Sequence, residues 1–205
     1  MTIALACSGP GDIASPPSPH AEIVRVPAIG AALPSLVMEA YHDGKITRIN
    51  LADYRGKWVV LFFYPGDFTF VCPTELKELA DYFPEFRSLG AEVLSISTDS
   101  AHVHRAWRLH EKSLARVSYP MLADRSGRLS RAMGVYNEGK GTAHRASFIV
   151  NPEGAVVAFE VHHDSIGRSA DELLRKLSAA ISVEKGGGGY CPAGWQPGEE
   201  MITPR

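Results

Sequence analysis

The order of the expected elements predicts an α/β fold in which a central mixed sheet is flanked by helices. Strand-like and helix-like segments alternate along most of the chain, and a strand hairpin followed by a helix closes the domain. The continuous apolar run at 59–64 is typical of a central strand that is covered on both faces. Together these observations favour a layered architecture with both parallel and antiparallel strand pairs.

The first elements lead to that central strand. The domain is expected to begin near Val26, and Asp43-Gly44 is followed by residues of alternating character at 46–51. An Asp-Gly pair between two strand-like runs is typical of a tight β-hairpin. The buried strand at 59–64 comes next, and Pro65 ends it.

A helix is expected after this strand. Pro73 stands at its entrance, Pro84 is expected to kink or interrupt it, and Gly90 is expected to end it. Its apolar residues recur at helical spacing: Leu76, Leu79, Ala80 and Phe83. The next strand is expected at 92–97.

A second helix is expected to begin after Ser100, whose hydroxyl can cap it. A short strand near Met121 and a short helix near Leu129 are expected to follow. One face of the second helix carries Val103, Ala106, Trp107 and Leu114.

Two strands and a helix close the domain. The strands are expected at 147–150 and 155–161, joined by a turn at 151–154. Ser169 begins a capping box, Ser-x-x-Glu, for the last helix. That helix is expected to bury Leu173, Leu174, Leu177 and Ile181, and four glycines at 186–189 mark the end of the packed domain.

The chain therefore divides into three expected parts: a flexible tail at 1–25, one domain at 26–184 and a C-terminal arm at 185–205. Its 205 residues are 45% hydrophobic, which is enough for a sizeable core, and the formal net charge is -2. This balance, without a basic stripe, argues against a nucleic-acid partner. No apolar run approaches the roughly 20 residues that span a bilayer, so no membrane partner is expected.

The three cysteines limit the classes of protein that fit the sequence. An odd, small number argues against a disulfide-stapled secreted scaffold and favours a reducing cytoplasm. Cys72 follows the buried strand and falls in the first turn of the expected helix, where unpaired N–H groups stabilise a thiolate. A free cysteine is more often a small apolar core residue, so the surroundings of Cys72 decide between the two interpretations.

The residues around Cys72 favour a reactive cysteine over a structural one. Pro65, Thr69 and Cys72 form the pattern Pro-x-x-x-Thr-x-x-Cys, in which the Thr69 hydroxyl can approach the sulfur. Arg145 stands immediately before a strand, and Arg168 stands before the last helix. Taken alone, Thr69 fits a loop or capping residue equally well, and the two arginines fit surface cations.

The segment FFYPGDFTFVCPTE at 62–75 makes a resemblance specific. The chain resembles the peroxiredoxins of the typical two-cysteine kind, close to the alkyl hydroperoxide reductase C subunits, from about residue 26 to residue 197. The resemblance implies a thioredoxin-like fold and a thiol-dependent peroxidase that acts in antioxidant defence. Its expected substrates are hydrogen peroxide and organic hydroperoxides, and no cofactor or metal is implied.

The resemblance also implies roles for individual residues. Cys72 matches the peroxidatic cysteine, which attacks the terminal peroxide oxygen and becomes a sulfenic acid. Thr69 and Arg145 match the residues that bind the peroxide oxygens, and Pro65 matches the residue that shields the site. A buried pair that orients the active-site arginine is matched by Glu75 and Arg168.

Cys191, in the segment GYCPAGWQPG, matches the resolving cysteine. In the relatives this thiol comes from the partner subunit, so a homodimer is expected, and such dimers often assemble into decamers. The expected electron donor is a flavoprotein disulfide reductase or a thioredoxin. Easily overoxidised relatives carry a Gly-Gly-Leu-Gly loop and a C-terminal helix with Tyr-Phe. Neither pattern occurs here, so resistance to overoxidation is expected, and Cys7 matches nothing in the family.

Other functions are less well supported. His102-x-His104 and His162-His163 could bind a metal, but no third ligand stands at useful spacing. The absence of Cys-x-x-Cys disfavours a thioredoxin-type disulfide reductase. The non-enzymatic alternative is a ring-forming holdase chaperone, whose suppression of aggregation could survive Cys72→Ser, whereas peroxide consumption should not.

Overall fold

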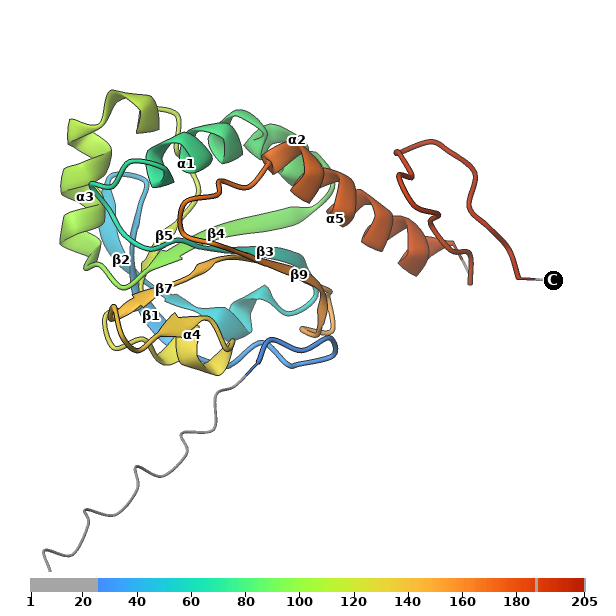
Figure 1. Cartoon of the computed structure of the whole chain (residues 1–205), viewed down its shortest axis with the longest axis horizontal. Coiled ribbons are helices and arrows are strands. Elements are labelled where there is room, and N and C mark those ends of the chain that lie inside the picture. The colour runs from blue at the N-terminus through green and yellow to red at the C-terminus, as the bar shows by residue number, and fades with distance from the viewer. Residues whose placement is uncertain (1–25, 187, 205) are drawn as a thin grey trace, which may run out of the picture.

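The structure is a computed structural model that describes residues 26–186 and 188–204, and a seven-stranded mixed sheet lies at its centre (Figure 1). The strand order is β2-β1-β5-β4-β3-β8-β9, in which the β3–β4 and β4–β5 pairs are parallel and the other pairs antiparallel. The strands are β1 Val37–His42, β2 Lys45–Asn50, β3 Trp58–Phe63, β4 Ala91–Ser97, β5 Met121–Ala123, β8 Arg145–Val150 and β9 Val156–His162. The expected mixed α/β architecture is confirmed.

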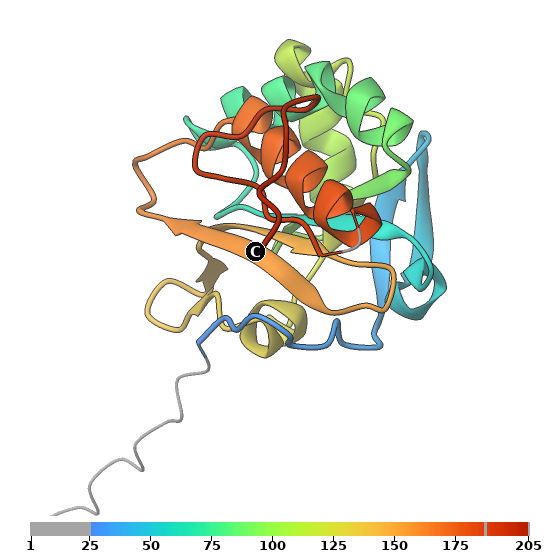
Figure 2. The same ribbon diagram turned by 90° about the vertical axis from the view of Figure 1, so that its right-hand side faces the viewer.

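Helices lie on both faces of this sheet (Figures 1 and 2). One face is covered by α1, α2 and α5, and α4 lies on the other; α3 adds its buried Trp107 to the core on the α1 side. The helices are α1 Cys72–Asp81, α2 Phe83–Ser88, α3 Ala101–His110, α4 Arg128–Ala132 and α5 Ala170–Lys185. Shorter elements are the 3-10 helices η1 Leu51–Tyr54 and η2 Lys112–Leu114, and the hairpin of β6 Tyr136–Asn137 and β7 Thr142–Ala143.

Strand β3 explains the apolar run that marked it in the sequence. Val60 and Phe62 belong to the core beneath α1 and α5, whereas Val59, Leu61 and Phe63 belong to the core on the α4 side. Because each face of β3 is covered, the strand carries no polar alternation. The strand thus forms a rigid base from which the chain leaves toward Cys72.

Two local predictions about turns are confirmed. Asp43 and Gly44 both have positive φ, at 48° and 76°, as the tight turn between β1 and β2 requires. Pro84 lies in the first turn of α2, and Tyr82 separates α1 from α2. The proline therefore starts a new helix where continuation of the old one would lose a hydrogen bond.

The prediction that Leu114 shares a helix with Trp107 was wrong. Helix α3 ends at His110, and Leu114 lies in η2, although it is buried in the same core. Glu111 has an extended backbone, and its carboxylate accepts a hydrogen bond from the Ser113 N–H at 3.0 Å. This side-chain cap starts a separate turn. The β6–β7 hairpin was not predicted.

The C-terminal arm folds back on itself beside the end of α5 (Figures 1 and 2). Tyr190 and Ile202 form an antiparallel bridge, and Trp195 is only 3% exposed. The predicted tail at 1–25, with Cys7, lies outside the described residues. Among the helices that the structure describes, none combines the length and the apolar character needed to cross a membrane.

Candidate active site

Cys72 is the first residue of α1, and its side chain is fully buried. Pro73 follows it, and the Thr74 hydroxyl donates to the Val71 carbonyl at 2.7 Å, so the first turn is well formed. Proline suits this turn because its missing N–H would have no helical partner there. The sulfur therefore lies at the electropositive end of a helix, where a thiolate is stabilised.

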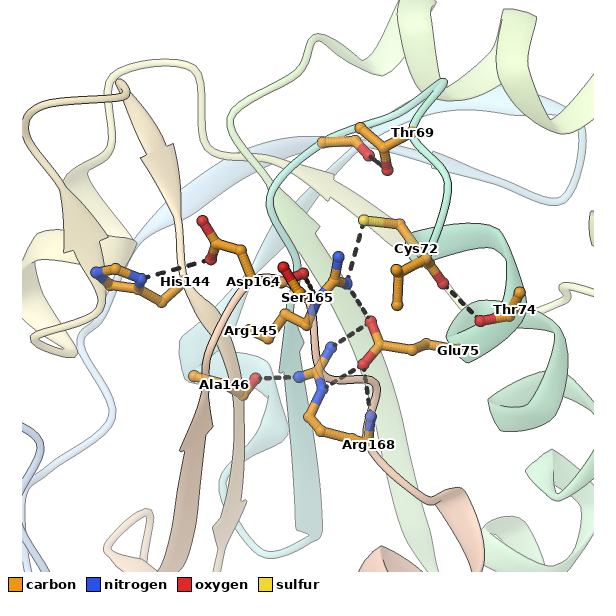
Figure 3. Close-up of polar contacts among 12 residues, drawn as sticks. Thr69, Cys72, Thr74, Glu75, His144, Arg145, Ala146, Asp164, Ser165 and Arg168 are labelled. Atoms are coloured by element: carbon orange, nitrogen blue, oxygen red, sulfur yellow. Dashed lines mark hydrogen bonds and ion pairs between the residues drawn. The ribbon is translucent and has the colours of Figure 1, made fainter.

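Arg145 brings a cation to this sulfur (Figure 3). It is the first residue of β8, and its Nη1 lies 3.3 Å from Cys72 Sγ and 2.5 Å from Glu75 Oε2. Its Nε donates to the Asp164 carbonyl at 2.8 Å. Burial by itself lowers the pKa of Arg145, but Cys72 and Glu75 outweigh it and hold the pKa above its ordinary value. The guanidinium is therefore a permanent positive charge beside the sulfur.

Glu75 joins two buried arginines. Its Oε1 accepts from the Arg168 backbone N–H at 2.8 Å and from Arg168 Nε at 2.9 Å, and its Oε2 accepts from Nη2 at 3.1 Å. Arg168 also donates to the Ala146 carbonyl at 2.7 Å and stacks over the Phe62 ring. Burial raises the pKa of Glu75, but the two arginines hold it below its ordinary value, so the carboxylate is ionised.

Thr69 and Pro65 flank this network without joining it. Thr69 is exposed on the loop before α1, and its hydroxyl donates to the Gly66 carbonyl at 2.9 Å. Within the part of the chain that the structure describes, Thr69 makes no hydrogen bond with Cys72 or Arg145. Figure 3 shows it on the side of Cys72 toward which the sulfur points. Pro65 is half-buried at the start of the same loop.

Cys191 lies elsewhere in the same chain. Both Cys72 and Cys191 are free thiols, and Cys191 Sγ faces the Ala179 carbonyl of α5 at 3.7 Å. Ala179 is ten residues beyond the Ser169 cap, roughly 15 Å along the helix axis. The arm is tied to this part of α5 because Arg175 Nη1 donates to the Trp195 carbonyl at 2.9 Å. The structure therefore does not bring the two predicted reactive cysteines together within one subunit.

A buried polar network behind the loop was missed by the sequence reasoning. The Tyr64 hydroxyl donates to Asp67 Oδ1 at 2.8 Å, and His104 Nδ1 lies 2.8 Å from Asp67 Oδ2. Burial raises the pKa of Asp67, although His104 opposes this effect. The network anchors the loop at 65–71 to α3. Its one visible signal was the position of His104 three residues before Trp107, on the buried face of the helix.

No metal-binding group of three or more His, Cys, Asp or Glu side chains occurs at residues 26–186 and 188–204. One histidine of the earlier metal hypothesis, His104, instead contacts Asp67 and the Leu122 carbonyl.

The family model described as the AhpC/TSA family matches residues 29–159. The chain belongs to this family. It is 43% identical over 166 residues to a protein named alkyl hydroperoxide reductase C from Salmonella typhimurium, covering 81% of this chain and 89% of that protein. These matches confirm the predicted family and, with it, an enzyme of the peroxiredoxin type.

Solved peroxiredoxin structures share the fold. The crystal structure of Enterococcus faecalis AhpC superposes with a TM-score of 0.78 at 45% identity, covering 81% of this chain and 99% of that chain. The reduced 2-Cys peroxiredoxin of Plasmodium vivax superposes with a TM-score of 0.81 at 34% identity, covering 86% and 93%. The predicted thioredoxin-like peroxiredoxin fold is confirmed.

Proposed function

We propose that this chain reduces hydrogen peroxide and organic hydroperoxides through Cys72, in antioxidant defence in the cytoplasm. The observation that carries the proposal is the contact between Arg145 Nη1 and Cys72 Sγ at 3.3 Å, at the N-terminus of α1. An inert core cysteine requires no counter-charge, whereas a reactive thiolate is stabilised by a neighbouring cation such as this guanidinium.

In the first half-reaction the Cys72 thiolate attacks the terminal oxygen of the hydroperoxide. The O–O bond breaks as the S–O bond forms, and the leaving alkoxide takes a proton to give an alcohol, or water from hydrogen peroxide. Cys72 becomes a sulfenic acid. The sulfur is oxidised by two electrons, and the peroxide is reduced by the same two.

Electrostatic stabilisation supplies the larger part of the rate. Negative charge moves from the sulfur to the leaving oxygen during the reaction. Arg145 can stabilise this charge because Glu75 and the Asp164 carbonyl hold two of its nitrogens in place. Nη2 makes no hydrogen bond within the described residues, so it is available to a peroxide oxygen. We assign the Thr69 hydroxyl to the other oxygen, and Pro65 to shielding the sulfur from water.

In the second half-reaction we propose that Cys191 of a partner subunit attacks the Cys72 sulfenic acid. The new S–S bond releases water, and an external disulfide reductase, a flavoprotein or a thioredoxin, returns the disulfide to two thiols. The position of Cys191 against the distal half of α5 supports resolution between subunits. For the disulfide to form, the first turn of α1 has to unwind.

Two surfaces support the assembly that this requires. Strand β9 is one of the two outer strands of the sheet, and its Phe159 and Val161 are 38% and 45% exposed, which suits edge pairing about a two-fold axis. Phe68 and Phe70, on the loop before α1, are 56% and 97% exposed. We propose that β9 forms the homodimer and that the aromatic loop joins dimers into a decamer.

One experiment tests nucleophile, resolver and linkage together. The protein receives one equivalent of hydrogen peroxide and is run on non-reducing gels as wild type, Cys72→Ser and Cys191→Ser. A disulfide-linked dimer is expected only in the wild type, and peroxide consumption with dithiothreitol is expected to vanish in Cys72→Ser. Consumption that persists in Cys72→Ser would refute the proposal.

The role of Arg145 has its own measurement. Arg145→Ala is expected to slow the reaction with peroxide by about 10²- to 10³-fold, the range for losing one preorganised charge donor. Alkylation of Cys72 by iodoacetamide, which has no O–O bond to polarise, is expected to slow far less. Equal slowing of both reactions would show that Arg145 acts only on the thiolate.

A further inference from the structure

The segment 163–168 joins β9 to α5 and contacts both Arg145 and Glu75. The carbonyl of Asp164 accepts from Arg145 Nε at 2.8 Å, and the same segment ends at Arg168, which binds Glu75. One short segment therefore contributes to the position of both arginines. Whatever holds Asp164 in place also holds one end of the active-site guanidinium.

The Asp164 carboxylate lies between the side chains of Lys140 and His144, which precede Arg145 in the chain. Lys140 Nζ, from the turn between β6 and β7, donates to Oδ2 at 2.5 Å. His144 Nδ1 lies 3.7 Å from Oδ1, and that oxygen is buried without a hydrogen bond from any residue that the structure describes. Lys140 foremost, with His144 and Arg145, holds the pKa of Asp164 below its ordinary value.

We propose that Lys140, His144 and Asp164 form a clamp that positions Arg145 for peroxide reduction. The inference rests on the proposed function and deepens it. Glu75 fixes Nη1 and the Asp164 carbonyl fixes Nε, and these two points set the plane of the guanidinium. Without the Asp164 carbonyl, the guanidinium is held only through Nη1, by Glu75 and Cys72, so it can turn about that nitrogen and Nη2 no longer points at the peroxide oxygen.

The clamp gives His144 a role other than that of a general base. In Figure 3 its ring faces Asp164, on the far side of Arg145 from Cys72. His144 is the residue immediately before β8, whose first residue is Arg145. The three side chains are positioning residues, because none of them contacts the sulfur.

The test compares clamp variants with a matched ion pair elsewhere. Asp164→Asn and Lys140→Met weaken the clamp, and Lys140→Arg retains its charge. Lys57→Met is the control, because Lys57 pairs with Glu92 at 3.0 Å with side-chain exposures of 49% and 24%, close to the 61% and 25% of Lys140 and Asp164. Stopped-flow mixing measures the second-order reaction with hydrogen peroxide, and mass spectrometry follows iodoacetamide alkylation of Cys72 across pH.

The two clamp variants are expected to lower the peroxide rate constant by about threefold to tenfold, because misorientation of a catalytic group is costly. Their alkylation profiles are expected to match the wild type, as are both readouts in Lys57→Met and Lys140→Arg. Peroxide rates equal to the control, or a parallel loss of alkylation, would overturn the clamp. A wild type that consumes no peroxide would instead refute the proposed function, and the clamp with it.

Discussion

Glu75→Gln is the most informative single change, because one buried carboxylate serves two buried arginines. The glutamine has nearly the same shape, so the change removes charge and one acceptor with little change in packing. Glu75 accepts one hydrogen bond from Arg145 and three from Arg168, over 2.5 to 3.1 Å, and the side chains of both arginines are at most 4% exposed.

The expected loss of stability follows from this burial. Removing one partner of a buried ion pair costs about 3–5 kcal/mol, because the remaining charge lies in the interior without compensation. The glutamine carbonyl can still accept from Arg168, so the lower end, about 3 kcal/mol, is expected for Glu75→Gln. Set against a typical total of about 5–15 kcal/mol, this loss is large. The peroxide rate is expected to fall about tenfold or more as Arg145 loses its anchor.

Acid sensitivity provides the second half of this prediction. Glu75 has a depressed pKa in the folded protein, so its contribution is fully present above the ordinary glutamate value of about 4.3. That contribution is lost as the pH falls from there through the folded pKa, because the unfolded chain then binds more protons. The wild type is therefore expected to lose stability more steeply than Glu75→Gln between about pH 5 and pH 2.

Urea unfolding measures both effects, and the protein concentration is kept fixed because the proposed assembly would make stability depend on it. The free energy of unfolding is compared at pH 7 and along the acid series. A variant that unfolds at the wild-type urea concentration at pH 7, with a parallel acid profile, would refute the reasoning. The hydrogen bonds of Glu75 would then contribute little to the free energy of unfolding.

Further predictions concern Cys191, the proposed resolving cysteine, and the packing of the core. Cys191→Ser is expected to abolish the peroxide-induced disulfide dimer while one equivalent of peroxide is still consumed; a retained dimer band on a non-reducing gel would exclude Cys191. Leu79→Ala, at a fully buried position in the α1 core, is expected to cost about 2–5 kcal/mol in urea unfolding, and a loss under about 1 kcal/mol would mean that the site collapses around the gap. Gly127→Ala is expected to lower the melting temperature more than Gly44→Ala. Both glycines have positive φ, but a Cβ at 127 would also meet the Tyr136 ring, whereas nothing lies within 4 Å at 44; equal shifts would contradict this.

Sequence patterns predicted those parts of the fold in which the conformation follows from the preferences of the local residues. The run at 59–64 reveals a strand because both of its faces are covered, and Asp43-Gly44 reveals a hairpin because the turn needs positive φ twice. Periodicity failed where a side chain overrode it. Glu111 caps Ser113 and ends α3 early, although the apolar spacing continues to Leu114.

The candidate site divides in the same way. Cys72 was visible because its position after a strand and at a helix start is local. Glu75 lies 70 residues from Arg145 and 93 from Arg168 in the chain, so their association was predicted through the family resemblance alone. Asp67 with His104, and Asp164 with Lys140, carry no motif, so only the folded chain reveals them.

Glu75 lies only three residues after Cys72, in the same helical turn. If that turn unwinds to present the oxidised sulfur to Cys191, Glu75 leaves both arginines in the same movement. The folded first turn, in which Arg145 can bind a peroxide, and the unwound turn, in which Cys72 can react with a thiol, are then mutually exclusive conformations. We expect the enzyme to alternate between these two conformations. A second peroxide and the Cys191 thiol would then react with Cys72 in different conformations.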